Sequence, residues 1–179
     1  MATETLRPNA PGDLTQLDPY PVTLPNWDCV NDEVADDDAT YVSAPEATGR
    51  DLYNLPDTAI PDGSTINSVT VVTRMCRDGT LSVTGYAVIK IGGTEYIGAL
   101  RTLGTSWTTY SDSWATNPYT GNPWTKTDIN ALQAGVNLGY DSRHGNYGIG
   151  MCTQVYVIVD YTPPTVAAKK PIMDGLILV

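Results

Sequence analysis

The sequence predicts an all-β protein: an antiparallel β-sandwich of the jelly-roll type, with about eight strands, one short helix and extended N- and C-terminal arms. The 179 residues include 16 glycines and 13 prolines, and only 17% are charged, which is not the composition of a helical protein. Segments rich in Val, Ile, Thr and Tyr recur about every 8 to 15 residues, as the strands of a sandwich do. The length fits one domain, because a single compact unit commonly has about 150 residues.

We expect three regions: an N-terminal arm of residues 1–26, the jelly-roll sandwich of residues 27–163, and a C-terminal arm of residues 164–179. The first region holds five prolines and no sustained periodicity, which excludes a helix or a central strand. Its backbone is therefore expected to be extended and to pair with a neighbouring subunit by strand addition. The last region ends in an apolar segment.

Four segments in the first half of the sandwich have the character of strands. Residues 27–31, 40–43 and 50–55 are short and rich in strand-forming residues. Residues 66–76 carry apolar side chains on both faces of the alternating pattern. This is typical of a strand in the middle of a sandwich.

Two glycine-containing dipeptides predict tight hairpins. Asp78-Gly79 precedes a strand expected over residues 81–91, in which apolar and polar positions alternate cleanly, and Gly92-Gly93 follows it. Residues 94–97 then form the next strand. We therefore expect the strand over 81–91 to have antiparallel neighbours on both sides.

The second half of the sandwich contains three further candidate strands, over residues 106–114, 136–140 and 149–161. A Gly-rich loop is expected at residues 141–148. The strongest strand pattern of the whole chain is that of residues 149–161.

Only one stretch has the character of a helix. Thr127 is a candidate N-cap, Ile129 and Leu132 share one face, and Gly135 follows as a candidate terminator. A helix of one or two turns depends on packing against the sandwich.

The charge balance excludes two classes of partner. Asp and Glu number 20 against 10 Lys and Arg, and the net charge of −10 repels nucleic-acid phosphates and anionic lipid. No apolar run approaches the roughly 20 residues that span a bilayer. The N-terminus has neither the basic start nor the apolar stretch of a signal peptide. We expect no nucleic-acid partner, no membrane association and no signal peptide.

Cysteine and histidine offer few candidates for chemistry. Cys29, Cys76 and Cys152 are widely spaced and odd in number, so they are expected to be small buried side chains rather than a disulfide framework. One disulfide is the alternative, if the protein matures outside the cell. His144 is the only histidine, which leaves no candidates for a multi-histidine metal site or a Ser-His-Asp triad. We expect no enzymatic activity and no required cofactor.

A series of short motifs runs from the start of the chain to about residue 163. The motif residues are Leu6-Arg7-Pro8; Trp27; Asp32-Glu33 with Asp36-Asp37-Asp38; Thr40-Tyr41-Val42; Asp51-Leu52-Tyr53; Gly63, Ile66 and Val69; Lys90, Gly92-Gly93 and Tyr96; Trp107-Thr108 and Tyr110; Trp114 and Thr116-Asn117-Pro118; Asp128, Leu132-Gln133 and Gly135-Val136; and residues 153–161. In these motifs the chain resembles a family of virion-associated jelly-roll β-sandwich proteins encoded by tailed phages, archaeal viruses and environmental genomes. The resemblance implies a component of a virus particle. Since the N-terminus lacks the pattern of a signal peptide, we expect the protein to be made in the host cytoplasm.

One acidic block is the sharpest chemical feature of the sequence. Its carboxylates are hard oxygen donors concentrated in one loop, and they are candidates for holding a structural Ca²⁺ ion. The alternatives are a solvated turn in which one Asp caps nearby N–H groups, and the acid-base pair of a glycosidase. The block consists of Asp32, Glu33, Asp36, Asp37 and Asp38.

Five aromatic residues fall within 18 positions of a polar region: Trp107, Tyr110, Trp114, Tyr119 and Trp124. Exposed rings interleaved with Thr, Ser and Asn side chains can stack on and hydrogen-bond to sugars, so these residues are a candidate carbohydrate site. In the alternative interpretation, Trp107 and Trp114 face the core and the tyrosines lie at its rim.

Both arms are expected to mediate self-association, through Leu6 and Pro8 at one end and Leu176, Ile177, Leu178 and Val179 at the other. An exposed apolar terminus would promote aggregation of a monomer, although it could instead fold back on its own sheet. We therefore expect a non-enzymatic virion structural protein, a capsid decoration, head or tail component, whose partners are its own copies and other virion proteins. The alternative is a jelly-roll carbohydrate-binding module, displayed on the particle, that binds surface glycans.

Overall fold

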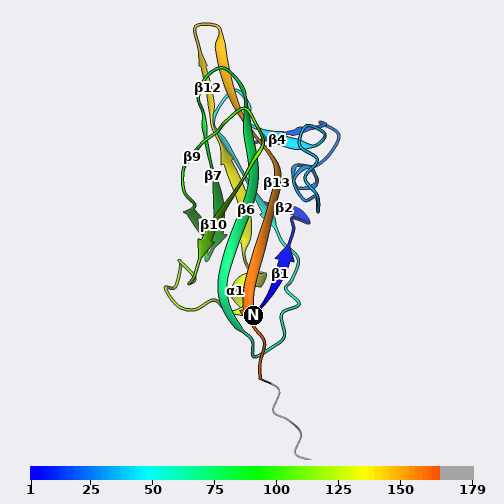
Figure 1. The fold of residues 1–179 in the computed structure, drawn as a ribbon, viewed down its shortest axis with the longest axis vertical. Helices are drawn as coiled ribbons and strands as arrows, with labels where there is room; N and C mark the ends of the chain where they lie inside the picture. The colour runs from blue at the N-terminus through cyan, green and yellow to red at the C-terminus, as the bar shows by residue number, and fades with distance from the viewer. Residues whose placement is uncertain (166–179) are drawn as a thin grey trace, which may run out of the picture.

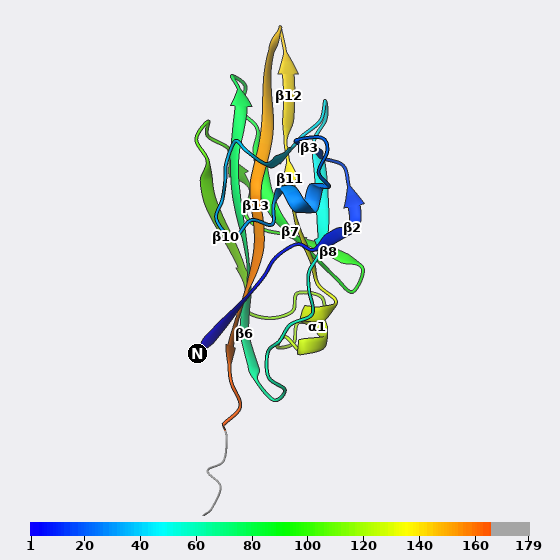
Figure 2. The same ribbon diagram turned by 90° about the vertical axis from the view of Figure 1, so that its right-hand side faces the viewer.

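The computed structural model describes residues 1–165, which form two antiparallel sheets packed face to face (Figure 1, Figure 2). The larger one, sheet A, has seven strands. Their order is β10 (Thr108–Trp114), β6 (Thr65–Gly79), β13 (Asn146–Thr162), β4 (Tyr41–Ser43) and β3 (Asp18–Tyr20), and both β1 (Ala2–Leu6) and β12 (Tyr140–Arg143) also pair with β13. β13 organises this sheet, because β6 lies along one of its edges while β12, β4 and β1 follow one another along the other.

The smaller one, sheet B, has six strands. Their order is β2 (Ala10–Thr15), β5 (Gly49–Asn54), β11 (Gln133–Leu138), β7 (Thr84–Ile91) and β8 (Thr94–Ile97), with the short β9 (Arg101–Thr102) also pairing with β7.

The connectivity of the eight principal strands is that of a jelly roll. These strands form the order β4-β13-β6-β10 in sheet A and β5-β11-β7-β8 in sheet B. Except between β7 and β8, each principal strand is followed in the chain by one in the opposite sheet. Eight strands connected in this way form the two Greek keys of a jelly roll, which confirms the predicted fold class.

The core lies between the two sheets and is filled by strand alternation. Val69 and Val71 of β6 and Val155, Val157 and Val159 of β13 all point inward and are fully buried. The intervening residues of these strands point away from sheet B. They form the surface that we call the outer face of sheet A.

The expected N-terminal arm is instead part of the sandwich. Residues 1–26 supply three edge strands of the same chain, with β1 on β13, β2 on β5 and β3 on β4. Leu6 and Pro8 are buried, so the prediction that they contact a neighbouring copy is wrong. Pro11 and Pro19 lie in edge strands, where one side of the backbone needs no ladder hydrogen bonds. The prolines therefore exclude a central strand, as expected, but not an edge strand.

The predictions for the C-terminal arm lie outside the described residues. Leu176, Ile177, Leu178 and Val179 fall within residues 166–179, so their role in self-association stays a prediction. Within residues 1–165, β13 ends at Thr162, close to the expected end of the sandwich. No helix in this part of the chain is long and apolar enough to cross a membrane.

The predicted short helix is present as α1 (Lys126–Asn130), but its expected ends are wrong. Thr125, rather than Thr127, is the N-cap: its hydroxyl accepts a hydrogen bond from the Asp128 N–H at 3.1 Å, and the Asp128 carboxylate accepts one from the Thr125 N–H. Gly135 does not end the helix but lies within β11. A Cβ there would come within 1.9 Å of the Asp51 carbonyl oxygen, so close strand packing explains this glycine.

The two predicted hairpins have different outcomes. Ile91 pairs with Thr94 across Gly92-Gly93, and both glycines have positive φ, which confirms the β7–β8 hairpin. After Asp78-Gly79, however, the chain passes from sheet A to sheet B, so the hairpin expected there is wrong. The local pattern indicates a turn but does not determine which sheet the next strand joins.

Two other segments also differ from the prediction. Residues 27–31, expected as a strand, overlap the 3-10 helix η1 (Asn26–Cys29). Residues 141–148, expected as a loop, form most of a hairpin in which β12 pairs with β13 around His144-Gly145. This hairpin extends beyond the other strands at one end of the molecule (Figure 1, Figure 2).

Cys29, Cys76 and Cys152 are buried and unbridged, as expected. Burial raises the pKa of Cys29 to about 11 and the pKa values of Cys76 and Cys152 to about 12. All three thiols therefore remain protonated and behave as small buried apolar side chains.

Candidate functional site

The outer face of sheet A brings together side chains that are distant in sequence. Cys76 of β6 pairs with Met151 of β13, which pairs with Ser43 of β4, so all three share this face. Tyr41 lies two residues from Ser43 and therefore points the same way, and Tyr20 pairs with Tyr41.

Tyr20, Tyr41 and Trp107 form a row of three rings, which we call the aromatic row. The rings of Tyr20 and Tyr41 are stacked, with centroids 4.9 Å apart and planes 17° apart. The Tyr41 and Trp107 centroids are 6.2 Å apart and their planes are tilted by 51°. Tyr20 is 49% exposed, and the other two are half-buried. The row thus combines fixed ring positions with ring surface that solvent can reach.

The acidic loop before β4 fixes one end of the aromatic row. The indole N–H of Trp107 donates a hydrogen bond to the Asp38 carboxylate at 2.8 Å. Asp37 is tied to the sheet by Arg74 of β6, whose Nε and Nη2 donate to the two carboxylate oxygens at 2.5 and 2.8 Å. This hydrogen-bonded ion pair holds the pKa of Asp37 below its usual value.

A pocket of about 570 Å³, which we call the hairpin pocket, opens beside the row. It lies at the point along β13 where pairing with β12 ends and pairing with β4 begins. At this point the Ala44 N–H donates a hydrogen bond to the Gly150 carbonyl. Its volume is within the about 300–1,000 Å³ typical of small-molecule sites. The polar and aromatic residues that line it include Asp18, Ser43, Glu46, Asp78, Tyr140 and Tyr147.

The hairpin pocket and the aromatic row are adjacent parts of one surface. Asp18 pairs with Ser43, and Tyr20 pairs with Tyr41, in the same antiparallel ladder. The pair that lines the pocket therefore lies two residues from the ring pair on the same face, which is about 7 Å along the strands. A ligand longer than one sugar-sized ring can contact both.

Two phenols of this surface are favoured in their neutral form. Burial raises the pKa of Tyr41, and the neighbouring Tyr20, Asp38 and Asp78 raise it further. The Asp78 carboxylate raises the pKa of Tyr147, whose hydroxyl donates to it at 3.2 Å. Both hydroxyls thus keep a proton to donate.

No protein-family model and no curated protein sequence matches the chain. Several solved carbohydrate-binding modules have a similar fold. The C-terminal CBM6 of the laminarinase LamC from Zobellia galactanivorans has 12% identity and a TM-score of 0.44, over 89% of this chain and 100% of that one. A structure described as "CBM4 structure and function" has 15% identity and a TM-score of 0.41, over 72% and 90%. Similarity at this level assigns neither a ligand nor a binding residue to this chain.

A third similar structure is the module CBM6cm-2 from Cellvibrio mixtus lichenase 5A, solved in complex with cellotriose. It has 11% identity and a TM-score of 0.39, over 89% of this chain and 98% of that one.

The predicted acidic cation site is not assembled. The carboxylates of Asp32 and Asp36 share one partner, those of Asp37 and Asp38 have others, and Glu33 contributes its backbone carbonyl, which accepts a hydrogen bond from the Arg7 side chain at 3.3 Å. Among residues 1–165, no three His, Cys, Asp or Glu side chains are placed to hold a metal ion. The carboxylate partners are Thr40 for Asp32 and Asp36, Arg74 for Asp37, and Trp107 for Asp38.

The five aromatic residues predicted as a carbohydrate site are not brought together. Only Trp107 belongs to the aromatic row. Trp124 is buried and donates its indole N–H to the Trp114 carbonyl, while Tyr110 and Trp114 pack against the core. Tyr119 is exposed beside the β7–β8 turn. The alternative interpretation is thus correct for Trp114, whereas Trp107 lies on the outer face.

The sequence did not single out Tyr20 or Tyr41 as site residues. Both are far from Trp107 along the chain and become its neighbours only when β3 and β4 join the edge of sheet A. One usable signal was the alternation in residues 40–43, which directs Tyr41 away from the buried Val42. The hairpin pocket could not be anticipated, because residues 141–148 were expected to be a loop.

Proposed function

We propose that this chain is a non-catalytic glycan-binding domain, which holds an oligosaccharide along the outer face of sheet A from Trp107 to the hairpin pocket. The observation that carries the proposal is the aromatic row beside a pocket of about 570 Å³. Apolar sugar faces stack on ring surface, and sugar hydroxyls require hydrogen-bonding groups at the edge of the rings. The row and the pocket supply both.

The hydrogen bonds around the row favour binding over catalysis. Asp37 and Asp38 are the carboxylates bonded around Trp107, and they are occupied by Arg74 and by the indole N–H. Such carboxylates position a ring rather than transfer a proton to a substrate. A fixed ring loses little conformational freedom when a ligand binds, which favours affinity.

The test is a glycan array followed by calorimetric titration of the best ligands. Replacing Trp107 by Ala removes one end of the row, and Tyr41→Ala removes its centre. We expect each change to weaken binding at least about fivefold, because stacking on one ring contributes on the order of 1 kcal/mol or more.

Tyr119→Ala is the matched control. Tyr119 is 54% exposed and lies at the β7–β8 turn, outside the row. Its replacement is expected to leave affinity unchanged. An array without any bound glycan, or equal losses in all three variants, would contradict the proposal.

A second candidate function is structural: self-association within a virus particle, as the sequence resemblance implies. The observation that favours it is the exposure of two apolar residues near the edge of sheet B. Ile97 ends the edge strand β8 and is 59% exposed, and Leu100 is 65% exposed. Exposed apolar side chains beside an edge strand promote pairing between copies.

Light scattering tests this second candidate. The wild-type chain is expected to have a mass above that of a monomer, which falls in an Ile97→Ser/Leu100→Ser variant and is retained in Val22→Ser, a control that is exposed elsewhere. Removing residues 164–179 tests the predicted C-terminal contribution separately. A wild-type monomer at high concentration would rule out self-association.

A further inference from the structure

We propose that the hairpin pocket selects glycans that carry protonated amines, of the glucosamine type, over neutral and acidic glycans. This inference rests on the proposed function and adds the ligand class to it.

The charge of the pocket lining is the first observation. Within residues 1–165, three acidic residues line the pocket, Asp18, Glu46 and Asp78, and no Lys, Arg or His lines it. Arg143 lies in the same hairpin but is bonded to Asp141, with an Nε–Oδ1 distance of 3.0 Å. The pocket therefore has an uncompensated negative charge, which the net charge of −10 of the chain reinforces.

The second observation concerns the hydrogen bonds of these carboxylates. Within the described residues, the side-chain oxygens of Asp18 and Glu46 accept no hydrogen bond, and Asp18 contacts Ser43 only through its backbone carbonyl. Most acidic side chains around the aromatic row, by contrast, have a protein partner. Asp18 and Glu46 are both exposed, and both line the hairpin pocket beside the end of the aromatic row.

The third observation is the aromatic part of the lining. Tyr140 and Tyr147 contribute rings to the pocket that already holds the carboxylates. An ammonium group placed there can form charge-assisted hydrogen bonds with carboxylates and interact with a ring face. An acetylated amine lacks the charge, and a uronate is repelled by it. The pocket thus distinguishes three classes of glycan by charge alone.

Calorimetric titration of the full-length wild-type chain tests this selectivity at mildly acidic pH and low salt. The probes are a fully deacetylated chitosan tetramer, the corresponding N-acetylated tetramer, an oligogalacturonate, and spermine as an amine without a sugar. We expect the deacetylated tetramer to bind at least about tenfold more tightly than the acetylated one, about 1.4 kcal/mol. This preference should decrease as salt is added.

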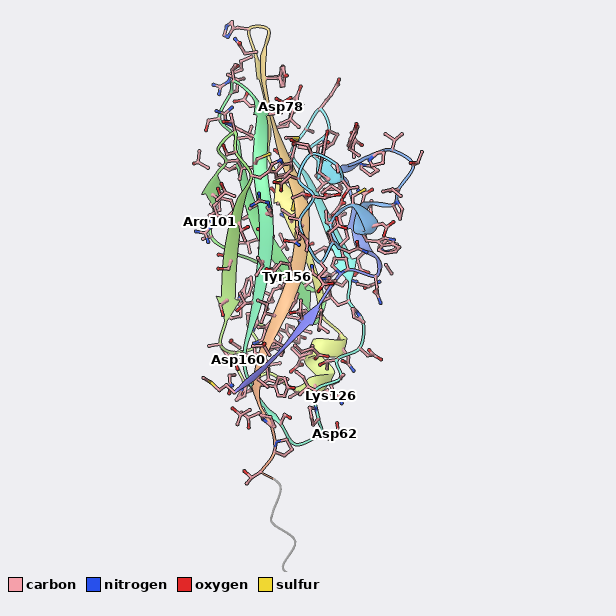
Figure 3. The ribbon with its side chains drawn as sticks, turned by 45° about the vertical axis from the view of Figure 1, so that its right-hand side comes forward. Asp62, Asp78, Arg101, Lys126, Tyr156 and Asp160 are labelled. Carbon is pink, nitrogen blue, oxygen red and sulfur yellow. The ribbon has the colours of Figure 1, made fainter. Side chains whose placement is uncertain are left out.

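The double variant Asp18→Asn/Glu46→Gln tests the assignment to this pocket. Both side chains lack hydrogen-bond partners within residues 1–165, so the variant is expected to fold normally, to lose the preference and to retain its affinity for the acetylated tetramer. Asp62→Asn is the matched control, because Asp62 is 92% exposed and lies at the opposite end of the molecule from Asp78 (Figure 3). It should keep the preference.

Four results would overturn the inference. Equal affinities for the two tetramers, or a preference that survives in the double variant, would reject amine selection but leave glycan binding intact. Spermine binding as tight as that of the deacetylated tetramer, and unaffected by Trp107→Ala, would assign the pocket to amines without sugars. Absence of binding to every glycan would reject the proposed function as well.

Discussion

The fully buried carboxylate of Asp51 fixes the segment that leads into β3. The N–H groups of Gln16 and Leu17 donate to one of its oxygens at 2.7 and 2.9 Å. Asn26 and Tyr53 donate to the other oxygen at 2.6 and 3.0 Å. Since β3 carries a ring of the aromatic row, this network connects the core to the candidate site.

Replacing Asp51 by Asn is expected to lower the free energy of unfolding by about 2 kcal/mol at neutral pH. The amide has one acceptor oxygen, so its NH₂ group would face two donors that Asp51 now satisfies. Urea denaturation measures the effect. Asp57→Asn, at an exposed position, is the control and should stay within about 0.5 kcal/mol of wild type. Equal stabilities of the two variants would contradict the role of the network.

The same carboxylate gives a pH dependence of defined sign. Burial raises the pKa of Asp51 above its ordinary value of 3.8. A pKa that is raised on folding stabilises the folded state fully below the unfolded-state pKa, and this contribution is lost as pH rises through the folded-state pKa. The difference in unfolding free energy between wild type and Asp51→Asn should therefore decrease from acidic to neutral pH. An increase would contradict the sign.

At the residue scale, the sequence predicted which residues belong to the candidate site better than it predicted which of them are in contact. It singled out Trp107 and the acidic residues that fix it, but assigned them to two separate sites. Their connection through the Trp107–Asp38 hydrogen bond spans 69 positions of the chain. A contact between residues so far apart in the sequence cannot be inferred from their positions in the chain.

At the scale of elements, β1 is the clearest departure from the prediction. Its five residues pair with the end of β13, and Leu6 is 3% exposed. The segment that was expected to contact another subunit thus completes the chain's own core.

Truncating Leu6 measures the contribution of β1. Leu6→Ala is expected to destabilise the fold by about 2 to 4 kcal/mol, because it leaves a cavity in the core. Thr5→Ala, at the neighbouring exposed position, should have little effect on the melting curve. Unchanged stability together with a lower oligomer mass would instead restore the original prediction of an intersubunit arm.

The elements that were predicted well are those with long alternation. β6, β7 and β13 were anticipated because each contains a long run of strand-forming residues, with apolar side chains on both faces in β6 and on one face in β7. The wrong predictions concern segments whose residue pattern is too short to assign, or whose strand geometry depends on pairing with another strand. η1 is a four-residue segment that periodicity cannot assign, and β12 gains strand geometry only from pairing with β13.

At the scale of the whole molecule, composition and strand spacing were sufficient for the fold class. The jelly-roll order follows, since about eight strands and one crossover helix leave few alternatives. The binding face could not be derived in the same way. It depends on β13 changing partners along one edge, which brings β3, β4 and the β12–β13 hairpin around one pocket.

The glycan-binding account depends on one surface, and the four tryptophans of the chain report on it. The most direct measurement is nuclear magnetic resonance of their indole N–H signals in isotope-labelled protein, titrated with the strongest ligand from the array. The account predicts that the Trp107 signal shifts with saturation, while that of Trp124, which is bonded within the core, does not. A stationary Trp107 signal at saturation, or shifts confined to the other tryptophans, would contradict it.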